Sequence, residues 1–411
     1  MKRKLLLFTL IVFISIPLTA EEFSDIYGEA GRILDNFLDK NKGRTAFPTL
    51  LIPMGGRYEG LGTAYTAVSS DSSYIESNPA ASASLEFTEL SFLHNDWIAD
   101  SKLEGIVYTI RFKDVGIGLG GKFLYVPFSE RNAWGEQISK GYYSENIAVA
   151  NVSYNLLSNY YFHGIAVGMN TKLAYRHVPA NIVEDQSAVT VMTDIGFLTR
   201  FDFLKFYYAR DRNFSVGATI KNLGFPALGD PLPTRIRGGL AYSPFRPILL
   251  TFDTIYPIVI PYDPDSQEAL SFSSGLEVTF SNFFSAHMGT LIEKGKPRIS
   301  LGGSVDIEQL TIITNYTLDM TTQINNLGDR FSIETKLNLG DRGRKERFQK
   351  AEEHYLNGLE AYANGNFDEA ISYWKAAISV YPEYTPARES LNMVMRSIQL
   401  QEEMEEKQKI E

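Results

Sequence analysis

The sequence predicts a mainly β protein, a transmembrane β-barrel of about 14 antiparallel strands with an N-terminal hatch, followed by a small all-α domain. Two observations predict the barrel. Fourteen segments of alternating apolar and polar residues fill residues 85–340, and the gaps between them tend to alternate between short and long. A third observation, an export signal at the N-terminus, places such a barrel outside the cytoplasm.

The last segment, residues 331–339, shows the alternation most clearly. Its odd positions hold Phe, Ile, Thr, Leu and Leu, and its even positions hold Ser, Glu, Lys and Asn. Successive side chains of a strand point to opposite faces, so this strand has one apolar and one polar face. A sheet with a long apolar face must bury that face in a core or in lipid.

The spacing of the segments favours lipid. Short turns at one end and long loops at the other are typical of bacterial outer-membrane barrels, whereas a soluble β-sandwich has no such rule. Short connections are expected at residues 113–114, 243–247, 281–282 and 306–308, and long ones at 127–142, 177–187, 222–235, 257–268 and 320–329. Three gaps depart from the rule: 293–297 is short, 155–163 is long, and 199–213 is either a long turn or an extra strand.

Residues 1–20 have the organisation of a signal peptide. Lys2, Arg3 and Lys4 precede an apolar run at residues 5–16, and the Leu-Thr-Ala of residues 18–20 forms a cleavage site. The apolar run is too short to span a membrane as a helix, which argues against an uncleaved anchor. Export fits the periplasm, the outer membrane or the exterior, and the barrel pattern favours the outer membrane.

The composition excludes several classes of function. The chain has no cysteine, which excludes disulfides, thiol nucleophiles, cysteine metal sites and a lipid anchor on an N-terminal cysteine. Its five histidines have no ligand spacing and no catalytic motif is present, so we expect no metal, no cofactor and no enzyme activity. A net charge of −10 gives no basic patch for nucleic acid. The 23 tyrosines and 26 phenylalanines suit two aromatic girdles in a membrane, or a packed β core.

Residues 21–43 are predicted to form an amphipathic helix. Apolar residues recur at spacings of three and four opposite acidic residues, and the Asn-Lys-Gly of residues 41–43 can end the helix. We favour packing on the barrel rim over an interfacial helix, because an acidic face is repelled by anionic lipid.

Residues 44–84 are small and polar and precede the first predicted strand, so we expect them to plug the lumen as a hatch. Four glycines fall within residues 55–62, which permits tight turns and close approach of the backbone. No Lys-Ser/Thr follows at the required place, so this is not a phosphate-binding loop. The expected hatch motif consists of Gly60, Gly62, Tyr65, Asp71, Asn78, Pro79 and Ala80.

This motif resembles the hatch of the FadL family, outer-membrane transporters of long-chain fatty acids and hydrocarbons. It also resembles the related PorV family of barrels tied to protein secretion, and the spacing from the glycines to Asn78 is nearer the PorV pattern. From about residue 53 to residue 339, the chain is most similar to an uncharacterised spirochaete group of FadL-like outer-membrane proteins. The resemblance implies a barrel of fourteen strands with the Asn-Pro-Ala sequence in the plug.

After a charged linker at residues 341–347, residues 348–411 resemble one tetratricopeptide repeat with a capping helix. Small residues let two helices approach closely, aromatic residues fill the gap between them, and a proline ends the second helix. One repeat buries little surface, so we expect this unit to dock on the barrel, to dimerise or to bind a partner. Its expected core is Gly358, Phe367, Ala370, Trp374, Ala377 and Pro382.

An even strand count puts both barrel ends on the short-turn side, so the C-terminal domain is expected in the periplasm. We expect outer-membrane transport of hydrophobic small molecules, most simply long-chain fatty acids, with membrane lipid as the surrounding partner. An assembly or secretion component that recruits a periplasmic protein is the alternative, and a soluble periplasmic β-protein is the third.

Two sets of residues bear on transport. The strand glycines within residues 116–121 mark either a lateral opening or close packing against the hatch. Apolar residues in the long loops form either a ligand-entry groove or simple loop packing. They are Phe225, Leu228, Leu232, Ile258, Val259 and Ile260.

Overall fold

A computed structural model describes residues 45–68, 70–96, 101–180, 185–209, 211–258, 260, 269–293, 296–320 and 329–410. The predicted signal peptide (1–20) and amphipathic helix (21–43) lie outside the described residues. Within the described parts of the chain, no helix has both the length and the hydropathy needed to cross a membrane.

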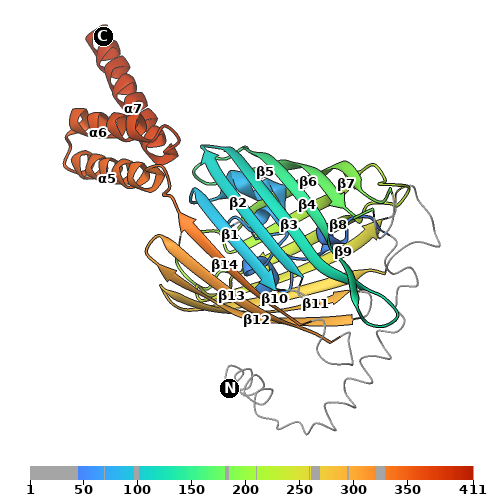
Figure 1. The fold of residues 1–411 in the computed structure, drawn as a ribbon. Helices are drawn as coiled ribbons and strands as arrows, with labels where there is room; N and C mark the ends of the chain where they lie inside the picture. Colours follow the sequence, from blue (N-terminus) through green and yellow to red (C-terminus); the bar gives the residue numbers. More distant parts are fainter. Residues whose placement is uncertain are drawn as a thin grey trace.

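Fourteen antiparallel strands close into one barrel, as predicted (Figure 1). Each strand pairs with its neighbours in sequence, and β1 closes the barrel against β14, with Glu89 opposite Asn338. The strands are β1 (Glu89–Asp96), β2 (Lys102–Phe112), β3 (Val115–Arg131), β4 (Gln137–Leu156), β5 (Ile165–His177), β6 (Ala188–Phe201), β7 (Phe214–Gly224), β8 (Thr234–Tyr242), β9 (Ile248–Ile258), β10 (Ser271–Ser281), β11 (Phe284–Glu293), β12 (Lys296–Ile307), β13 (Leu310–Asp319) and β14 (Arg330–Asn338).

The two ends of the barrel differ. We call the end where β1 begins and β14 ends the base, and the opposite end the mouth. At the base, the described residues between β6 and β7, 202–209 and 211–213, belong to a long connection and form no extra strand. At the mouth, the expected loop at 127–142 is wrong, because β3 and β4 continue as a paired hairpin to Arg131 and Gln137. Both faces of this hairpin are largely exposed, so its sequence lacks the apolar alternation that marks the other strands.

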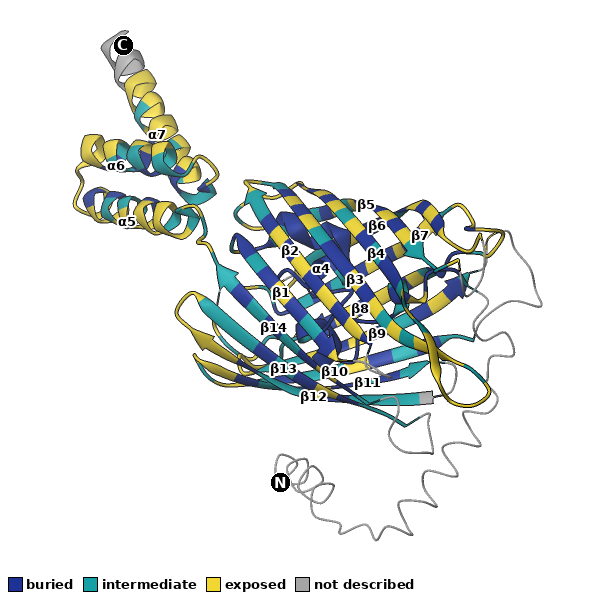
Figure 2. Cartoon of the chain, in the orientation of Figure 1, coloured by how far each residue is buried: buried dark blue, intermediate teal, exposed yellow. Residues whose placement is uncertain are grey.

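The alternation along the strands places polar side chains inside the barrel and apolar side chains outside. In β14, Ser332, Glu334 and Lys336 are buried in the lumen, whereas Phe331 is 43% exposed. Figure 2 shows the same alternation of buried and exposed residues along the wall. A soluble β-sandwich buries its apolar face, so the pattern here is the reverse of that fold.

Residues 45–68 and 70–85 fold inside the barrel as the hatch. It consists of four short pieces: η2 (Pro48–Leu51), α3 (Gly56–Gly60), α4 (Tyr74–Ser77) and η3 (Pro79–Ser84). The hatch begins at the mouth, where the amide of Ala46 donates to the carbonyl of Pro231 at 2.9 Å. It ends at the base, where Leu85 leads into β1. Positive φ angles at Gly55, Gly56 and Gly62 bend the chain tightly between these pieces.

Three helices follow the barrel: α5 (Arg344–Ala363), α6 (Phe367–Val380) and α7 (Thr385–Ile410). Helix α5 begins inside the stretch expected to be a linker (341–347). The carboxylate of Asp341 accepts hydrogen bonds from the amides of Gly343 at 2.8 Å and Lys345 at 2.6 Å, which starts the helix there. Gly365, with φ +81°, ends the turn between α5 and α6.

The helical domain rests on the base of the barrel. Tyr160, in the connection between β4 and β5, packs edge-on against Tyr384, with 5.2 Å between the ring centroids. The neighbouring Tyr161 hydroxyl donates to the carboxylate of Glu389 in α7 at 2.7 Å. The connection at 155–163 is therefore longer than a tight turn because it also carries this contact.

Candidate functional site

Glycines on the inner face of the wall let the hatch touch the strands' backbone. A Cβ atom on Gly168 would lie 2.3 Å from the carbonyl oxygen of Pro79, and one on Gly289 would lie 1.9 Å from the amide nitrogen of Gly62. Gly116, Gly118 and Gly120 also face hatch atoms, which supports close packing rather than a weak point in the strand, whereas a Cβ atom on Gly121 would meet the side chains of the wall residues Phe123 and Ile106. Further wall glycines meet the hatch in the same way: Gly196, Gly217, Gly239 and Gly275.

The Asn-Pro-Ala sequence joins the hatch to the wall. The Asn78 side-chain amide donates to the carbonyls of Thr66 at 2.7 Å and of Phe197 in β6 at 2.9 Å. Its side-chain oxygen accepts from the amide of Ala80 at 3.1 Å and so caps η3, with Pro79 at the first position of that helix. One asparagine therefore holds two hatch segments and one strand together.

Asp71 forms the centre of a buried charge cluster. Its carboxylate accepts from Lys336 of β14 at 2.6 Å, from Arg57 at 3.3 Å and from the Tyr65 hydroxyl at 2.8 Å. Burial alone would raise the pKa of Asp71, but Lys336 and Arg57 outweigh burial and hold that pKa below its ordinary value. Arg57 also makes a two-pronged contact with Glu277 of β10 at 2.8 and 2.7 Å.

Two more hatch-to-wall contacts lie on either side of this cluster. Glu59, 1% exposed, pairs with Arg330 of β14 and accepts from the Thr317 hydroxyl at 3.0 Å. Asp253 of β9 accepts from the amide of Thr66 at 3.1 Å and pairs with Arg237 at 3.3 Å. The hatch is therefore bound to opposite parts of the wall through buried charges.

A small amphipathic cavity lies between the hatch and strands β3, β4, β5 and β7, with a volume of about 30 Å³. Its apolar lining is Leu50, Met54 and Ile75 of the hatch with Ile147 and Val149 of β4. Its polar lining is Lys122, Lys172, Lys221 and Glu76. Such a volume holds one or two water molecules and no larger ligand.

The three lysines of this cavity are not fully neutralised. Lys122 pairs with Glu76 at 2.7 Å and Lys172 pairs with Asp194 at 2.6 Å. Lys221 is 8% exposed, and its ammonium donates to the backbone carbonyl of Glu76. Among the described residues, no carboxylate lies within 4.0 Å of it. Three lysines thus share two carboxylates in a largely apolar setting.

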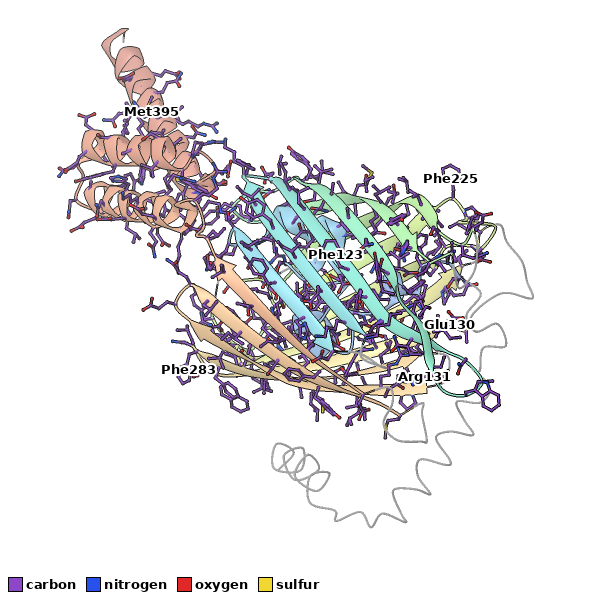
Figure 3. The ribbon with its side chains drawn as sticks, in the orientation of Figure 1. Phe123, Glu130, Arg131, Phe225, Phe283 and Met395 are labelled. Atoms are coloured by element: carbon purple, nitrogen blue, oxygen red, sulfur yellow. The ribbon has the colours of Figure 1, made fainter. Side chains whose placement is uncertain are left out.

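The remaining predicted site residues are distributed as follows. Gly60 lies against His287 and Gly62 against Thr290, as hatch residues. In the loops, Phe225 (81% exposed) and Leu228 (53%) project at the mouth, as Figure 3 shows for Phe225. Leu232, in contrast, is buried.

The described members of the expected entry groove therefore differ in their exposure. Leu232 packs in a cluster with Phe47 and Met192, because the loop that carries it covers the start of the hatch. Ile258 ends β9 and is half-buried, and Ile260 is 39% exposed. Val259 lies outside the described residues.

In the helical domain, Ala370, Trp374 and Ala377 are buried in one core. Gly358 is essential to that core, since a Cβ atom there would lie 2.4 Å from the indole nitrogen of Trp374. Phe367 departs from the expected core: it is 46% exposed at the start of α6, where its ring packs against that of Tyr362.

Pro382 is exposed in the turn after α6. Its role is to end that helix rather than to fill the core.

Sequence reasoning missed the lumen charges. Lys122, Lys172 and Lys221 each stand on the polar face of a strand, which is the available signal in the sequence. That signal marks the lumen face but does not reveal which charges from different strands meet there.

A closed barrel with a polar lumen filled by its own N-terminal segment defines a plugged β-barrel as the class of protein. The chain belongs to the family described as Uncharacterised protein family (UPF0164), whose model matches residues 26–341. A UPF0164 protein of Treponema pallidum (strain Nichols) is 27% identical over 380 residues, covering 89% of this chain and 86% of the relative. A second from the same organism is 26% identical over 388 residues, covering 88% of this chain and 77% of the relative.

Solved structures of a toluene transporter and of a hydrocarbon channel are similar to part of this chain. The Pseudomonas putida toluene transporter TodX matches with a TM-score of 0.45 and 11% identity, covering 68% of this chain and 95% of that chain. The CymD monoaromatic hydrocarbon channel matches with a TM-score of 0.47 and 10% identity, covering 70% of this chain and 97% of that chain.

Proposed function

We propose that this chain is an outer-membrane β-barrel that transports hydrophobic small molecules with an anionic head group, most simply long-chain fatty acids. The observation that carries the membrane placement is the reversed burial of the wall. Polar side chains such as Asn151 and Asp194 are buried in the lumen, while Leu119 (58% exposed) and Phe252 (44%) point outward. In water, such an apolar outer surface would drive aggregation, whereas lipid is its natural solvent.

Aromatic residues support two membrane surfaces. Near the base, the ring of Phe206 stacks on that of Phe245, with 5.6 Å between the ring centroids. Phe283, labelled in Figure 3, lies at the same end and is 62% exposed. Toward the mouth, Tyr125 stacks on Tyr142 at 5.4 Å on the outside of the wall. Outer-membrane barrels carry such aromatic girdles at both lipid–water boundaries. We propose that the base and the helical domain lie in the periplasm, because β1 begins and β14 ends at the base and the ends of such barrels lie on the periplasmic side.

The cavity lined by Lys122, Lys172 and Lys221 supports an anionic head group as part of the proposed ligand. Once the cavity is opened, Leu50, Met54 and Ile75 would contact an apolar chain on one side, and Lys221 would pair with a carboxylate. The present volume of about 30 Å³ is too small for such a ligand, so binding requires the hatch wall of the cavity to move. A ligand carboxylate beside Lys221 would compensate the cost of burying a charged ammonium there.

Native mass spectrometry of the full chain, purified from outer membranes in mild detergent and followed by lipid extraction, tests this proposal. We expect a single-chain fatty acid to co-purify with the protein and to be lost from Lys221→Gln. Lys375→Gln, which changes an exposed lysine on α6, is the matched control and should keep the ligand. Recovery of the protein from the soluble fraction, or equal ligand in both variants, would contradict the proposal.

The helical domain favours a second candidate function, an assembly or secretion component that recruits a periplasmic protein through a tetratricopeptide-like unit. Helix α7 exposes Met393 (64%), Met395 (51%) and Met404 (64%), of which Met395 is labelled in Figure 3. Exposed methionines suit adaptable protein surfaces. Deletion of residues 344–411 separates the two functions, because ligand binding in the lumen should survive it and partner recruitment should not.

A further inference from the structure

Three arginines meet at the base of the barrel around the point where the hatch ends. Arg111 stands at the end of β2, Arg200 at the end of β6, and Arg344 at the start of α5. All three guanidinium groups donate to carbonyls of residues 84–86. Arg200 donates to the carbonyl of residue 84 at 3.3 Å, and Arg111 to that of residue 85 at 3.3 Å. Arg344 donates to the carbonyls of residues 85 and 86.

These contacts leave most of the donors free. A guanidinium has five N–H donors in a planar fork that matches a carboxylate or phosphate. Arg344 Nη1 is buried without a hydrogen-bond partner. Among the described residues, none of the three arginines forms an ion pair within 4.0 Å. Like charges gathered in this way repel each other unless an anion lies between them.

The nearby carboxylates do not neutralise the cluster. Glu86 and Asp211 are exposed residues that line the same cavity. Asp341 lines it as well, but its oxygens are used by the amides at the start of α5. Asp114 and Glu383 lie farther from Arg111 and act on it only through space. The cluster therefore keeps a net positive charge.

The arginines line a cavity of about 360 Å³ between the barrel base and the helical domain. Its walls also contain the amide side chains of Asn155 and Asn159 and the aromatic rings of Tyr160, Phe348 and Tyr381. A second cavity of about 350 Å³ shares Ser84, His163 and Arg200 with the first and extends to Ala67, Val68 and Leu249 beside the hatch. Volumes of this size accept small-molecule ligands.

We propose that this base cavity binds the oxyanion head group of a single-chain amphiphile after it has passed the hatch. The arginine cluster, Arg111, Arg200 and Arg344, would hold the carboxylate or phosphate, and the aromatic rings would cover the start of the apolar chain. The helical domain forms one side of the site through Arg344 and Phe348. The inference deepens the proposed function, on which it rests, because it names where the transported molecule is held on the periplasmic side.

Calorimetric titration of the full chain in lipid nanodiscs tests the inference, with dodecanoate, dodecyl phosphate, dodecanol and inorganic phosphate as probes. We expect dodecanoate to occupy two sites in the parent protein, one at Lys221 and one at the arginine cluster. Arg200→Gln should leave one site and weaken binding at the base at least tenfold, and Arg200→Lys should keep most of it. Arg246→Gln changes an exposed arginine in the turn between β8 and β9 and is the matched control.

The outcomes separate the two proposals. If Arg200→Gln keeps both sites while Lys221→Gln loses one, the base site is wrong and the lumen site stands. If Lys221→Gln keeps both sites and Arg200→Gln loses one, the base site stands and the lumen pocket of the proposed function is wrong. Dodecyl phosphate should bind as dodecanoate does and dodecanol at least tenfold more weakly. Inorganic phosphate binding as tightly as dodecyl phosphate would overturn an amphiphile as the occupant.

A loss of folding in Arg200→Gln does not remove the test. Arg344→Gln changes the same cluster from α5, outside the barrel wall, and should also weaken binding at the base at least tenfold. Unchanged affinity in a folded Arg344→Gln protein, with normal docking of the helical domain, would contradict the site.

Discussion

Neutralising Asp71 should loosen the hatch, and the size of the effect follows from its surroundings. The side chains of Asp71 and Lys336 are each 7% exposed and lie 2.6 Å apart, and Arg57 at 3.3 Å is 16% exposed. Removing one partner of a buried ion pair costs about 3–5 kcal/mol, because the other charge remains buried without compensation. In Asp71→Asn, Arg57 retains Glu277, and Lys336 retains only Glu334 at 3.6 Å. We therefore expect a loss near the lower end, about 3 kcal/mol.

Urea unfolding of the protein in lipid vesicles measures this loss as a change in the free energy of unfolding. The matched variant is Lys336→Met, and the double variant Asp71→Asn/Lys336→Met should be destabilised by less than the sum of the two single changes. A loss below about 1 kcal/mol in Asp71→Asn, or strict additivity in the cycle, would refute the charge cluster as a link between hatch and wall.

The pH dependence of the free energy of unfolding tests independently whether the charged form of Asp71 stabilises the folded protein. Because the pKa of Asp71 is held below its ordinary value, its contribution to stability is complete above about pH 4 and is lost only as the pH falls through the lowered pKa. The stability difference between the parent and Asp71→Asn should shrink as the pH falls below about pH 4.

Three further predictions follow from the same structure. Leu119→Arg, on the outer face of β3, should destabilise the barrel in lipid by about 2–4 kcal/mol, measured by urea unfolding. Leu356→Arg, which changes an exposed residue of α5, should not destabilise the barrel, and equal effects of the two changes would contradict a lipid-facing wall. Gly168→Leu should displace Pro79 and raise the conductance of the barrel in planar bilayers. Gly238→Leu should not raise the conductance, because a Cβ atom there meets nothing within 4 Å, and unchanged conductance in both variants would mean that the hatch does not seal the lumen. Trp374→Ala should destabilise the helical domain by about 3–5 kcal/mol, seen as faster proteolysis of residues 344–411, and Phe367→Ala should have a much smaller effect.

Much of the fold was predictable because every strand of a lipid-facing sheet shows the alternation of apolar and polar residues in its own sequence. The odd and even positions of residues 331–339 identify the two faces of β14 without knowledge of its neighbours. The extension of β3 to Arg131 was not predictable, because a hairpin exposed on both faces needs no apolar alternation. Phe367 was misjudged for a related reason: the repeat pattern gives its place at the start of α6 but not whether another helix covers it.

The candidate site was predictable only in part. Asn78-Pro79-Ala80 and the glycines stand close together in the sequence, so the hatch motif is visible there. Lys122 and Lys221 come from two strands that are distant in sequence, and the arginine cluster comes from two strands and a helix that are also distant. Only the closed barrel brings the two lysines to one site and the three arginines to another. The sequence marks Leu232 as an apolar loop residue whether the loop forms a ligand-entry groove or simply packs. Its burial was not predictable, because Leu232 packs against Phe47, which comes from the hatch.

Uptake across an intact outer membrane tests the central claim most directly. The full chain would be expressed in a Gram-negative host that lacks its own long-chain fatty-acid transporter, and uptake of a radiolabelled long-chain fatty acid would be measured. The account predicts uptake well above the empty-vector level, a return toward that level in Lys221→Gln, and no loss in Lys375→Gln. Protein that is inserted in the outer membrane and yet leaves uptake at the empty-vector level would contradict the account.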